Sequence, residues 1–173
     1  MKKFLILTAF LILQISTVFA SVEKHIDKQI NYEMEYPIVY TKNQAAQDKI
    51  NQDIYKYIAA FRNDYNAGEF YSGSFSYKVR FEDEKYISIT MTQFEHSRGA
   101  ASGFLKVYGV VYDKNFGKKL PLSHFVKITL DDLYGYYFYD GFVEDGTEIK
   151  QYVHPEYISE NYYLLGNGGI ALI

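Results

Sequence analysis

The sequence predicts a single α+β domain in which a meander of antiparallel strands packs against one long helix and one short helix. Several segments between residues 28 and 113 alternate apolar and polar side chains, which is the period of a half-buried strand. Segment 43–67 instead repeats apolar residues at steps of three and four, as an amphipathic helix does. Segment 130–139 shows the same helical spacing over a shorter stretch.

The first twenty residues are typical of a secretory signal peptide. Lys2 and Lys3 form a basic head, an apolar run follows, and Val18-Phe19-Ala20 has the small-x-small pattern that signal peptidase cleaves. We therefore expect a mature domain, residues 21–173, in the periplasm, the cell wall or the medium, with no stable membrane span after cleavage. The alternative is an uncleaved anchor, because the apolar run is about long enough to span a bilayer when tilted.

Composition restricts the partners of residues 21–173. Without Lys2 and Lys3, 16 basic residues face 21 acidic ones, a net charge of −5 that disfavours nucleic acid and anionic lipid. The chain has no cysteine, so its stability has to come from the core and not from disulfides. The 19 tyrosines suit half-buried sheet faces, and the same property suits recognition of sugars or proteins.

The first strand is expected at residues 28–40. Alternate residues share one face there, namely Ile30, Tyr32, Met34 and Tyr36. Pro37 indicates an edge or a bulge, because proline lacks the N–H that a sheet ladder needs.

The long helix follows, at residues 43–67. Its apolar stripe consists of Ala46, Ile50, Ile54, Ile58, Phe61 and Tyr65, and its polar face includes Lys49, Gln52, Asp53, Lys56 and Asn63. Thr41 or Asn43 can cap its start, and Gly68 can supply the left-handed residue that ends it.

Three further strands are expected at residues 70–81, 86–94 and 102–113. The charged stretch Glu82 to Lys85 between the first two is predicted to be a solvated hairpin tip. Gly99-Ala100-Ala101 separates the last two and is expected to form a bulge or bend. Together the three strands complete the predicted meander.

The short helix is expected at residues 130–139. Thr129 with Asp132 three residues later resembles a capping box, and acidic residues favour the positive end of the helix dipole. Tyr136 and Tyr139 lie off its predicted apolar face. They are our candidate ligand-contacting residues, against the alternative that they are ordinary surface aromatics.

Two hairpins are expected near the end of the chain. Asp145-Gly146 and Asn167-Gly168 are dipeptides that two-residue hairpin turns favour, because both central residues then take positive φ. The last residues, Ile170 to Ile173, form an apolar strand without charge. An unprotected apolar edge predicts a domain that lacks its last strand or strands, or one that another chain completes.

No catalytic set, metal site or cofactor motif is predicted. The histidines His25, His96, His124 and His154 do not fall at metal-ligand spacing, and neither Ser72 nor Ser102 lies in a nucleophile elbow. A carboxylate pair for cleavage of a glycan need not be close in sequence. Glu95 and Asp113 are examples of possible partners, with no advantage over other acidic residues.

The order of elements resembles a bacterial extracytoplasmic domain family. The matching segments are Tyr36-Pro37, Ile50-Asn51, Arg98 to Gly103, Val110 to Asp113, Gly117-Lys118 with Leu120 to Phe125, and Asn161 to Leu164 before Asn167-Gly168. Two proteins share this family: the lysozyme-sensing anti-sigma factor, as its outer part, and a peptidoglycan deacetylase, as its N-terminal non-catalytic part. Ser102 stands where the family often has a histidine, so no role of that histidine carries over. We also find no deacetylase metal site and no sigma-binding segment before the apolar run.

The resemblance implies a non-enzymatic binding domain. The expected ligand is a cell-wall glycan such as peptidoglycan, or a secreted protein such as lysozyme. One alternative is an enzyme acting on wall polymers, a hydrolase or deacetylase. Another is a structural partner completed by strand addition.

Overall fold

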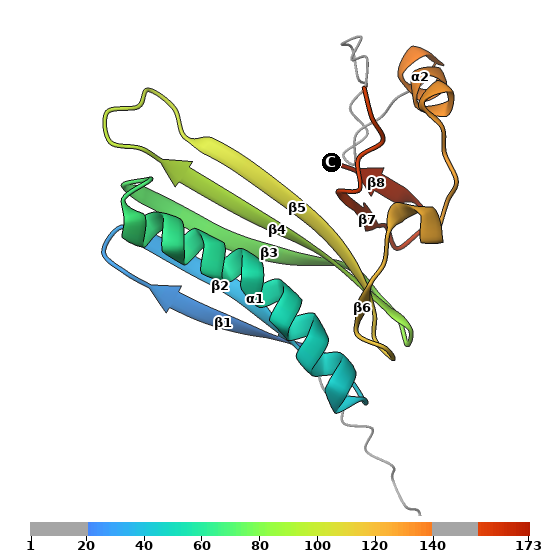
Figure 1. Ribbon diagram of the computed structural model, residues 1–173, viewed down its shortest axis with the longest axis horizontal. Helices are drawn as coiled ribbons and strands as arrows, with labels where there is room; N and C mark the ends of the chain where they lie inside the picture. The colour runs from blue at the N-terminus through green and yellow to red at the C-terminus, as the bar shows by residue number, and fades with distance from the viewer. Residues whose placement is uncertain (1–20, 140–155) are drawn as a thin grey trace, which may run out of the picture.

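The computed structural model describes residues 21–139 and 156–173, without the side chains of residues 136–139. A six-stranded sheet in the order β1-β2-β3-β4-β5-β6 forms its body (Figure 1). These strands are β1 (Val22–Lys28), β2 (Tyr32–Val39), β3 (Ser72–Glu82), β4 (Tyr86–His96), β5 (Phe104–Asp113) and β6 (Lys118–Lys119). Neighbouring strands are antiparallel except β2 and β3, which are parallel and joined through helix α1 (Gln44–Ala67). The predicted α+β class is confirmed.

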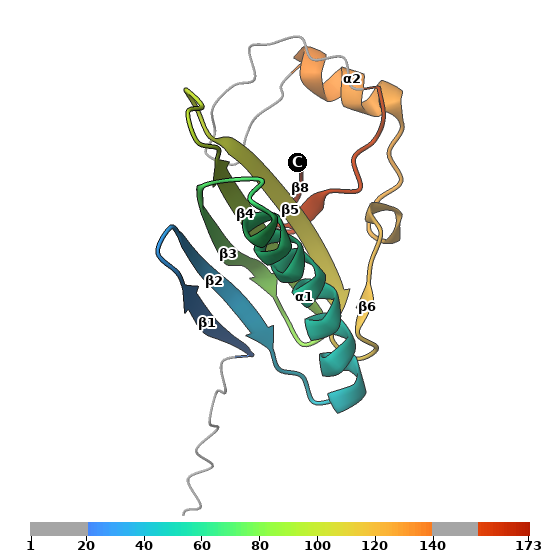
Figure 2. The same cartoon turned by 60° about the vertical axis from the view of Figure 1, so that its left-hand side comes forward.

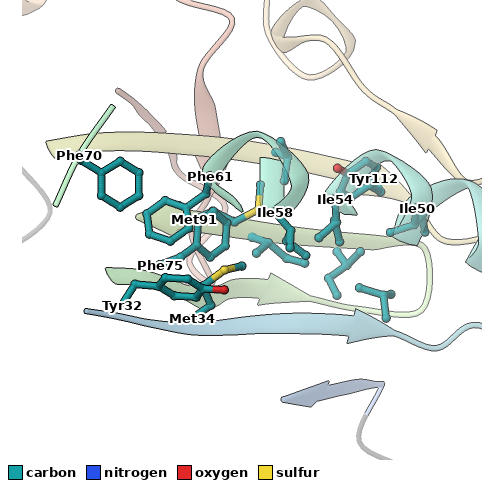
Figure 3. Close-up of a cluster of buried hydrophobic side chains, with 14 residues drawn as sticks. Tyr32, Met34, Ile50, Ile54, Ile58, Phe61, Phe70, Phe75, Met91 and Tyr112 are labelled. Carbon is teal, nitrogen blue, oxygen red and sulfur yellow. The ribbon is translucent and has the colours of Figure 1, made fainter. Parts of the chain in front are cut away.

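The long helix α1 lies where the sequence predicts it. The Asn43 side chain accepts hydrogen bonds from the backbone N–H groups of Ala45 and Ala46, and Gly68 ends the helix in the left-handed conformation with φ 80°. The predicted stripe from Ala46 to Phe61 is buried against the sheet. Figure 3 shows Ile50, Ile54, Ile58 and Phe61 of this stripe above the sheet, packed in one cluster with Met34, Phe75 and Met91 of the facing strands.

The predicted strand 28–40 was wrong at its start. Residues Gln29 to Asn31 form a turn, closed by a 2.9 Å hydrogen bond from Gln29 N to Tyr32 O, and Ile30 is 97% exposed. Ile30 lies two residues before Tyr32 and therefore fits the apolar alternation of β2. The alternation for this reason predicted a strand where the chain turns. The edge strand β1 was missed because its largely polar sequence has no apolar stripe.

Pro37 lies inside β2, opposite Lys24 of the edge strand β1. On its other side β2 pairs with β3 only from Tyr32 to Met34. Pro37 therefore lies beyond the end of that ladder, and β3 requires no N–H from it.

The opposite face of the sheet is covered by a second, small sheet of β7 (Tyr162–Leu164) and β8 (Ile170–Leu172). Figure 2 shows this hairpin behind β5, on the side away from α1. Both faces of β4 are consequently buried, and Ser88 Oγ accepts a 2.9 Å hydrogen bond from the backbone N–H of Leu164. A second apolar cluster fills this side, formed by Val111, Leu120, Leu122, Tyr162 and Leu164.

The β7–β8 hairpin is present, but its turn is not the predicted two-residue type. Gly168 has φ 82°, whereas Asn167 does not have positive φ. Gly168 N donates to Leu165 O at 3.1 Å, and Leu165 N donates to Gly169 O at 2.8 Å. The loop therefore has three residues, with glycine at the left-handed position.

The remaining expectations concern α2 (Leu130–Tyr139), whose predicted bounds are confirmed. Its start has the expected reciprocal bonds, from Thr129 N to Asp132 Oδ2 at 2.7 Å and from Asp132 N to Thr129 Oγ1 at 3.2 Å. The signal segment 1–20 and the hairpin predicted around Asp145-Gly146 lie outside the described residues. Of the helices in the described part of the chain, none combines the length and the apolar character needed to cross a bilayer.

Candidate functional site

A groove of about 460 Å³ lies between the N-terminal half of α1 and the turn that joins β5 to β6. Figure 2 shows β6 beside this part of the helix. We call it the lysine groove, and its described lining consists of Lys49, Gln52, Asp53, Lys56, Tyr112, Phe116, Gly117, Lys118 and Lys119. Its volume is within the range that small-ligand sites occupy.

The floor of the lysine groove is a fixed Tyr–Asp–Lys chain. The buried Tyr112 donates its hydroxyl hydrogen bond to Asp53 Oδ2 at 2.9 Å, and Lys56 Nζ lies 2.8 Å from Asp53 Oδ1. Burial alone would raise the pKa of the Asp53 carboxyl, but the hydrogen bonds from Lys56 and Tyr112 outweigh it and hold that pKa below its usual value. Burial, and then the charge of Asp53, raise the pKa of the Tyr112 phenol above its usual value. Asp53 is thus held ionised and Tyr112 neutral.

The walls of the groove carry more positive charge than Asp53, its one carboxylate, can balance, although Lys119 also contributes to the lowered pKa of Asp53. Lys49 stands on α1, and Lys118 and Lys119 stand on β6. Among the described residues none of these three forms an ion pair with a carboxylate, while Lys119 Nζ donates to the Tyr57 hydroxyl at 2.9 Å. The groove therefore presents net positive charge on a domain whose overall charge is negative.

The rim of the groove is a stiff turn that holds an aromatic ring in solvent. Asp113 is buried and accepts backbone hydrogen bonds from Asn115 at 2.8 Å and from Phe116 at 3.2 Å. Gly117 has φ 67°, and a Cβ atom at this position would overlap with the backbone of Ala46 in the first turns of α1. The Phe116 side chain is nevertheless 71% exposed. The backbone is thus ordered by its neighbours while the ring stays free for a ligand.

A second, wider hollow lies where the start of β1, the residues before α1 and the β3–β4 tip meet. Several of its charged groups have partners, although within the described chain Lys42 and Glu84 form no ion pair. Lys114 Nζ lies 2.6 Å from Glu82 Oε1, and the Tyr40 hydroxyl donates to Glu23 at 2.7 Å. Asp83 accepts backbone hydrogen bonds from Lys85 and Tyr86, so the predicted charged hairpin tip is a self-capped turn. This hollow offers a ligand less unpaired charge than the lysine groove does.

The structure keeps apart Glu95 and Asp113, the two acidic residues named as examples of possible catalytic partners. Glu95 lies opposite Phe104 at one end of β5, and Asp113 ends that strand nine residues later. At the rise of a β-strand this is a separation of about 30 Å, far beyond that of a glycosidase carboxylate pair. Glu95 instead receives hydrogen bonds from Gln93 and Lys106, and Asp113 orders the β5–β6 turn. Both acids thus make contacts within the sheet and its turn.

The candidate contact residues Tyr136 and Tyr139 both belong to α2, but their side chains lie outside the described residues, so their role stays a prediction. Of the three histidines among the described residues, two contact aromatic rings, His25 that of Tyr36 and His124 that of Tyr86. Within residues 21–139 and 156–173 no three His, Asp or Glu side chains form a group suited to a metal ion.

Sequence reasoning missed the lysine groove as a site. The helical pattern predicts only that Lys49 and Lys56 lie on the polar face of the helix, and Gly117-Lys118 enters only through the family resemblance. The available signal was weak. It consists of two lysines seven residues apart on one helix, which places them two turns apart on nearly the same side, and a second lysine pair behind a glycine turn.

Comparison with known proteins gives similarity of fold only. No protein-family model matches the chain, and no curated protein matches it. A solved structure of a DUF3298 family member from Bacteroides fragilis matches with a TM-score of 0.51 and 13% identity, over 83% of this chain and 78% of that one. A DUF3298 family protein from Pseudomonas aeruginosa matches with a TM-score of 0.46 and 12% identity, over 68% of this chain and 60% of that one.

The B. fragilis structure provides the argument from similarity, because its match includes most of both chains. It agrees with the α+β arrangement derived above. The protein therefore has a DUF3298-like fold, that of a family of unknown function.

Proposed function

We propose that this chain is an extracytoplasmic, non-enzymatic domain that binds a cell-wall glycan. The observation that carries the proposal is the lysine groove, an ordered hollow with unpaired lysines on two walls and an exposed aromatic ring at its rim. Aromatic rings and a few fixed polar groups are the usual means by which proteins hold sugars. The signal-like segment 1–20 supports a location where such a polymer is encountered.

The chemistry of the groove favours binding over catalysis. Hydrolysis of a glycosidic bond uses two carboxyl groups, one of which has to be protonated to act as the acid. The described lining of the groove contains one carboxylate, Asp53, and its lowered pKa keeps it charged. A general acid needs the opposite shift. We therefore prefer a binding domain to the hydrolase alternative.

The charge of the groove also distinguishes between the two ligands that the family resemblance implies. A basic secreted protein such as lysozyme would meet like charge from Lys49, Lys118 and Lys119. A wall glycan with carboxylate groups would meet opposite charge. The glycan is the ligand that this site favours, and Tyr136 and Tyr139 stay as additional proposed contacts.

Titration calorimetry on the purified protein tests the proposal, with soluble peptidoglycan fragments in one series and lysozyme in another. We expect saturable heat with the fragments, and unchanged fragments when the mixture is separated by chromatography afterwards. Saturable binding of lysozyme alone would replace the glycan with the protein ligand. New cleavage products would establish the enzymatic alternative.

A further inference from the structure

We infer that the lysine groove recognises an anionic sugar, one that carries a carboxylate or a phosphate group, and that it selects against neutral sugars. The anionic group would lie between Lys49 on α1 and Lys118 and Lys119 on β6, with the sugar ring against Phe116. This inference rests on the proposed function, and it names the chemical class that the groove selects.

The first step is the charge balance of the groove. It contains four lysines and one carboxylate, and that carboxylate is already engaged by Lys56 and Tyr112. Elsewhere in the described chain four lysines have carboxylate partners within 3.1 Å, namely Lys24, Lys28, Lys106 and Lys114, and four form no ion pair, namely Lys42, Lys78, Lys85 and Lys127. The groove differs from these sites because three lysines without a carboxylate partner line one hollow. Acidic residues outnumber basic ones, so partners for the groove lysines would be easy to supply. A ligand anion is the partner that completes this balance.

The second step is the arrangement of the charges. Lys49 and Lys118 stand on opposite walls, one on a helix and one on a strand, and the hollow between them is concave. Concave surfaces with one sign of charge concentrate counter-ions more strongly than flat ones do. Hydrogen bonds from an ammonium group to a carboxylate or phosphate are also stronger than those to a neutral hydroxyl. The groove therefore favours a charged ligand over a neutral one of the same shape.

The third step is the position of Phe116. Its backbone is held by Asp113 and its neighbour Gly117 packs against α1, so the backbone that carries the ring needs little further ordering when a ligand arrives. A lysine surface that served only for solubility would not need an exposed aromatic ring beside it. Together with the lysines, the ring fits a ligand that has both an apolar sugar face and a negative charge.

Three tetrasaccharides of similar size test this inference by titration calorimetry on the purified protein, at low and at high salt. The first is the neutral N-acetylglucosamine tetramer, the second alternates N-acetylglucosamine with N-acetylmuramic acid, and the third is the neutral tetramer carrying one phosphate. We expect the acidic forms to bind about tenfold more tightly or better, as one charge-assisted contact provides, and to lose this advantage at high salt. Comparison of the second and third forms tells whether carboxylate or phosphate is preferred.

Variants assign the effect to the groove. Lys49→Gln and Lys118→Gln should each weaken binding of the acidic forms about tenfold and leave the neutral form unchanged, whereas Lys118→Arg should retain binding. Phe116→Ala should weaken both forms. Lys78→Gln is the matched control. On β3, Phe75, Tyr77 and Val79 face α1, so the exposed Lys78 between them faces the opposite side of the sheet, away from the groove. Unchanged thermal unfolding would show that each variant is folded.

Two results would overturn the inference. If acidic and neutral tetrasaccharides bind equally and Lys118→Gln has no effect, the groove does not select for charge, although glycan binding itself would stand. If no tetrasaccharide and no peptidoglycan fragment binds, the inference and the proposed function fail together.

Discussion

The two faces of the main sheet are covered in different ways. On one face, the 24 residues of α1 bury a continuous stripe of isoleucine and phenylalanine against β2 to β5. On the other face, two strands of three residues each pack together with Leu120 and Leu122. The helix face is held mainly by apolar area, which is non-directional. The hairpin face relies more on individual contacts, such as Gly109, where an added Cβ atom would overlap with the backbone of Tyr162.

Both faces also use an asparagine as a clip. Asn51 on α1 accepts from the backbone N–H of Val39 and donates to its carbonyl, each at 2.8 Å. Asn161, before β7, accepts from the N–H of Gly109 and donates to the carbonyl of Val107. Each amide thus pairs with backbone groups of a strand as a further strand would. Both asparagines thereby hold a neighbouring element against the main sheet.

The largest effect is expected from the helix face. Phe61→Ala should lower the free energy of unfolding by about 3 to 5 kcal/mol, because the Phe61 ring is fully buried against Tyr32, Phe70 and Phe75. Urea denaturation measures this change. Tyr55→Ala on the same helix is the control, since Tyr55 is 55% exposed and its loss should cost less than about 0.5 kcal/mol. Equal losses for the two variants would contradict the assignment of the core.

An intermediate effect is expected from each asparagine clip. Asn161→Ala and Asn51→Ala each remove two hydrogen bonds and leave backbone groups unpaired, which should cost about 1 to 3 kcal/mol. The two variants should differ in where protection is lost. Hydrogen exchange should accelerate at Leu164 for Asn161→Ala and at Val39 for Asn51→Ala. Uniform acceleration throughout the sheet in both would show that the two faces do not open separately.

The same contrast explains what the sequence could predict. The bounds of α1 and α2 follow from local periodicity and from caps such as Asn43 and Thr129, which lie beside the helices they begin. The packing of the β7–β8 hairpin over β4 does not follow from local sequence. Ser88 gives no local signal, because the group that donates to it, the backbone N–H of Leu164, lies far along the chain. The lysine groove could not be predicted from the sequence for the same reason. Lys49 and Lys118 share a hollow only because α1 crosses beside β6, and neither residue is unusual where it stands in the sequence.

The smallest effect is expected at the floor of the groove, from Asp53→Asn. At neutral pH this variant should be less stable than the natural protein by less than about 1 kcal/mol, because Asp53 is partly exposed and its ion pair with Lys56 is screened. The folded pKa of Asp53 is lowered, so its stabilising contribution is present above the pKa of the unfolded chain. That contribution is lost as the pH falls through the folded pKa.

The stability gap between the natural protein and Asp53→Asn should therefore close in acid, and urea denaturation at a series of pH values measures it. In a Tyr112→Phe background, Asp53→Asn should cause a smaller loss of stability, since Tyr112 supplies one of the two hydrogen bonds that lower the pKa of Asp53. A gap that stays constant down to strongly acidic pH would mean that Asp53 acts through its shape and not through its charge. The floor of the groove would then resemble the hairpin face, which depends on close packing. The lysines on the walls would in that case have to position a ligand without a contribution from the charge of Asp53.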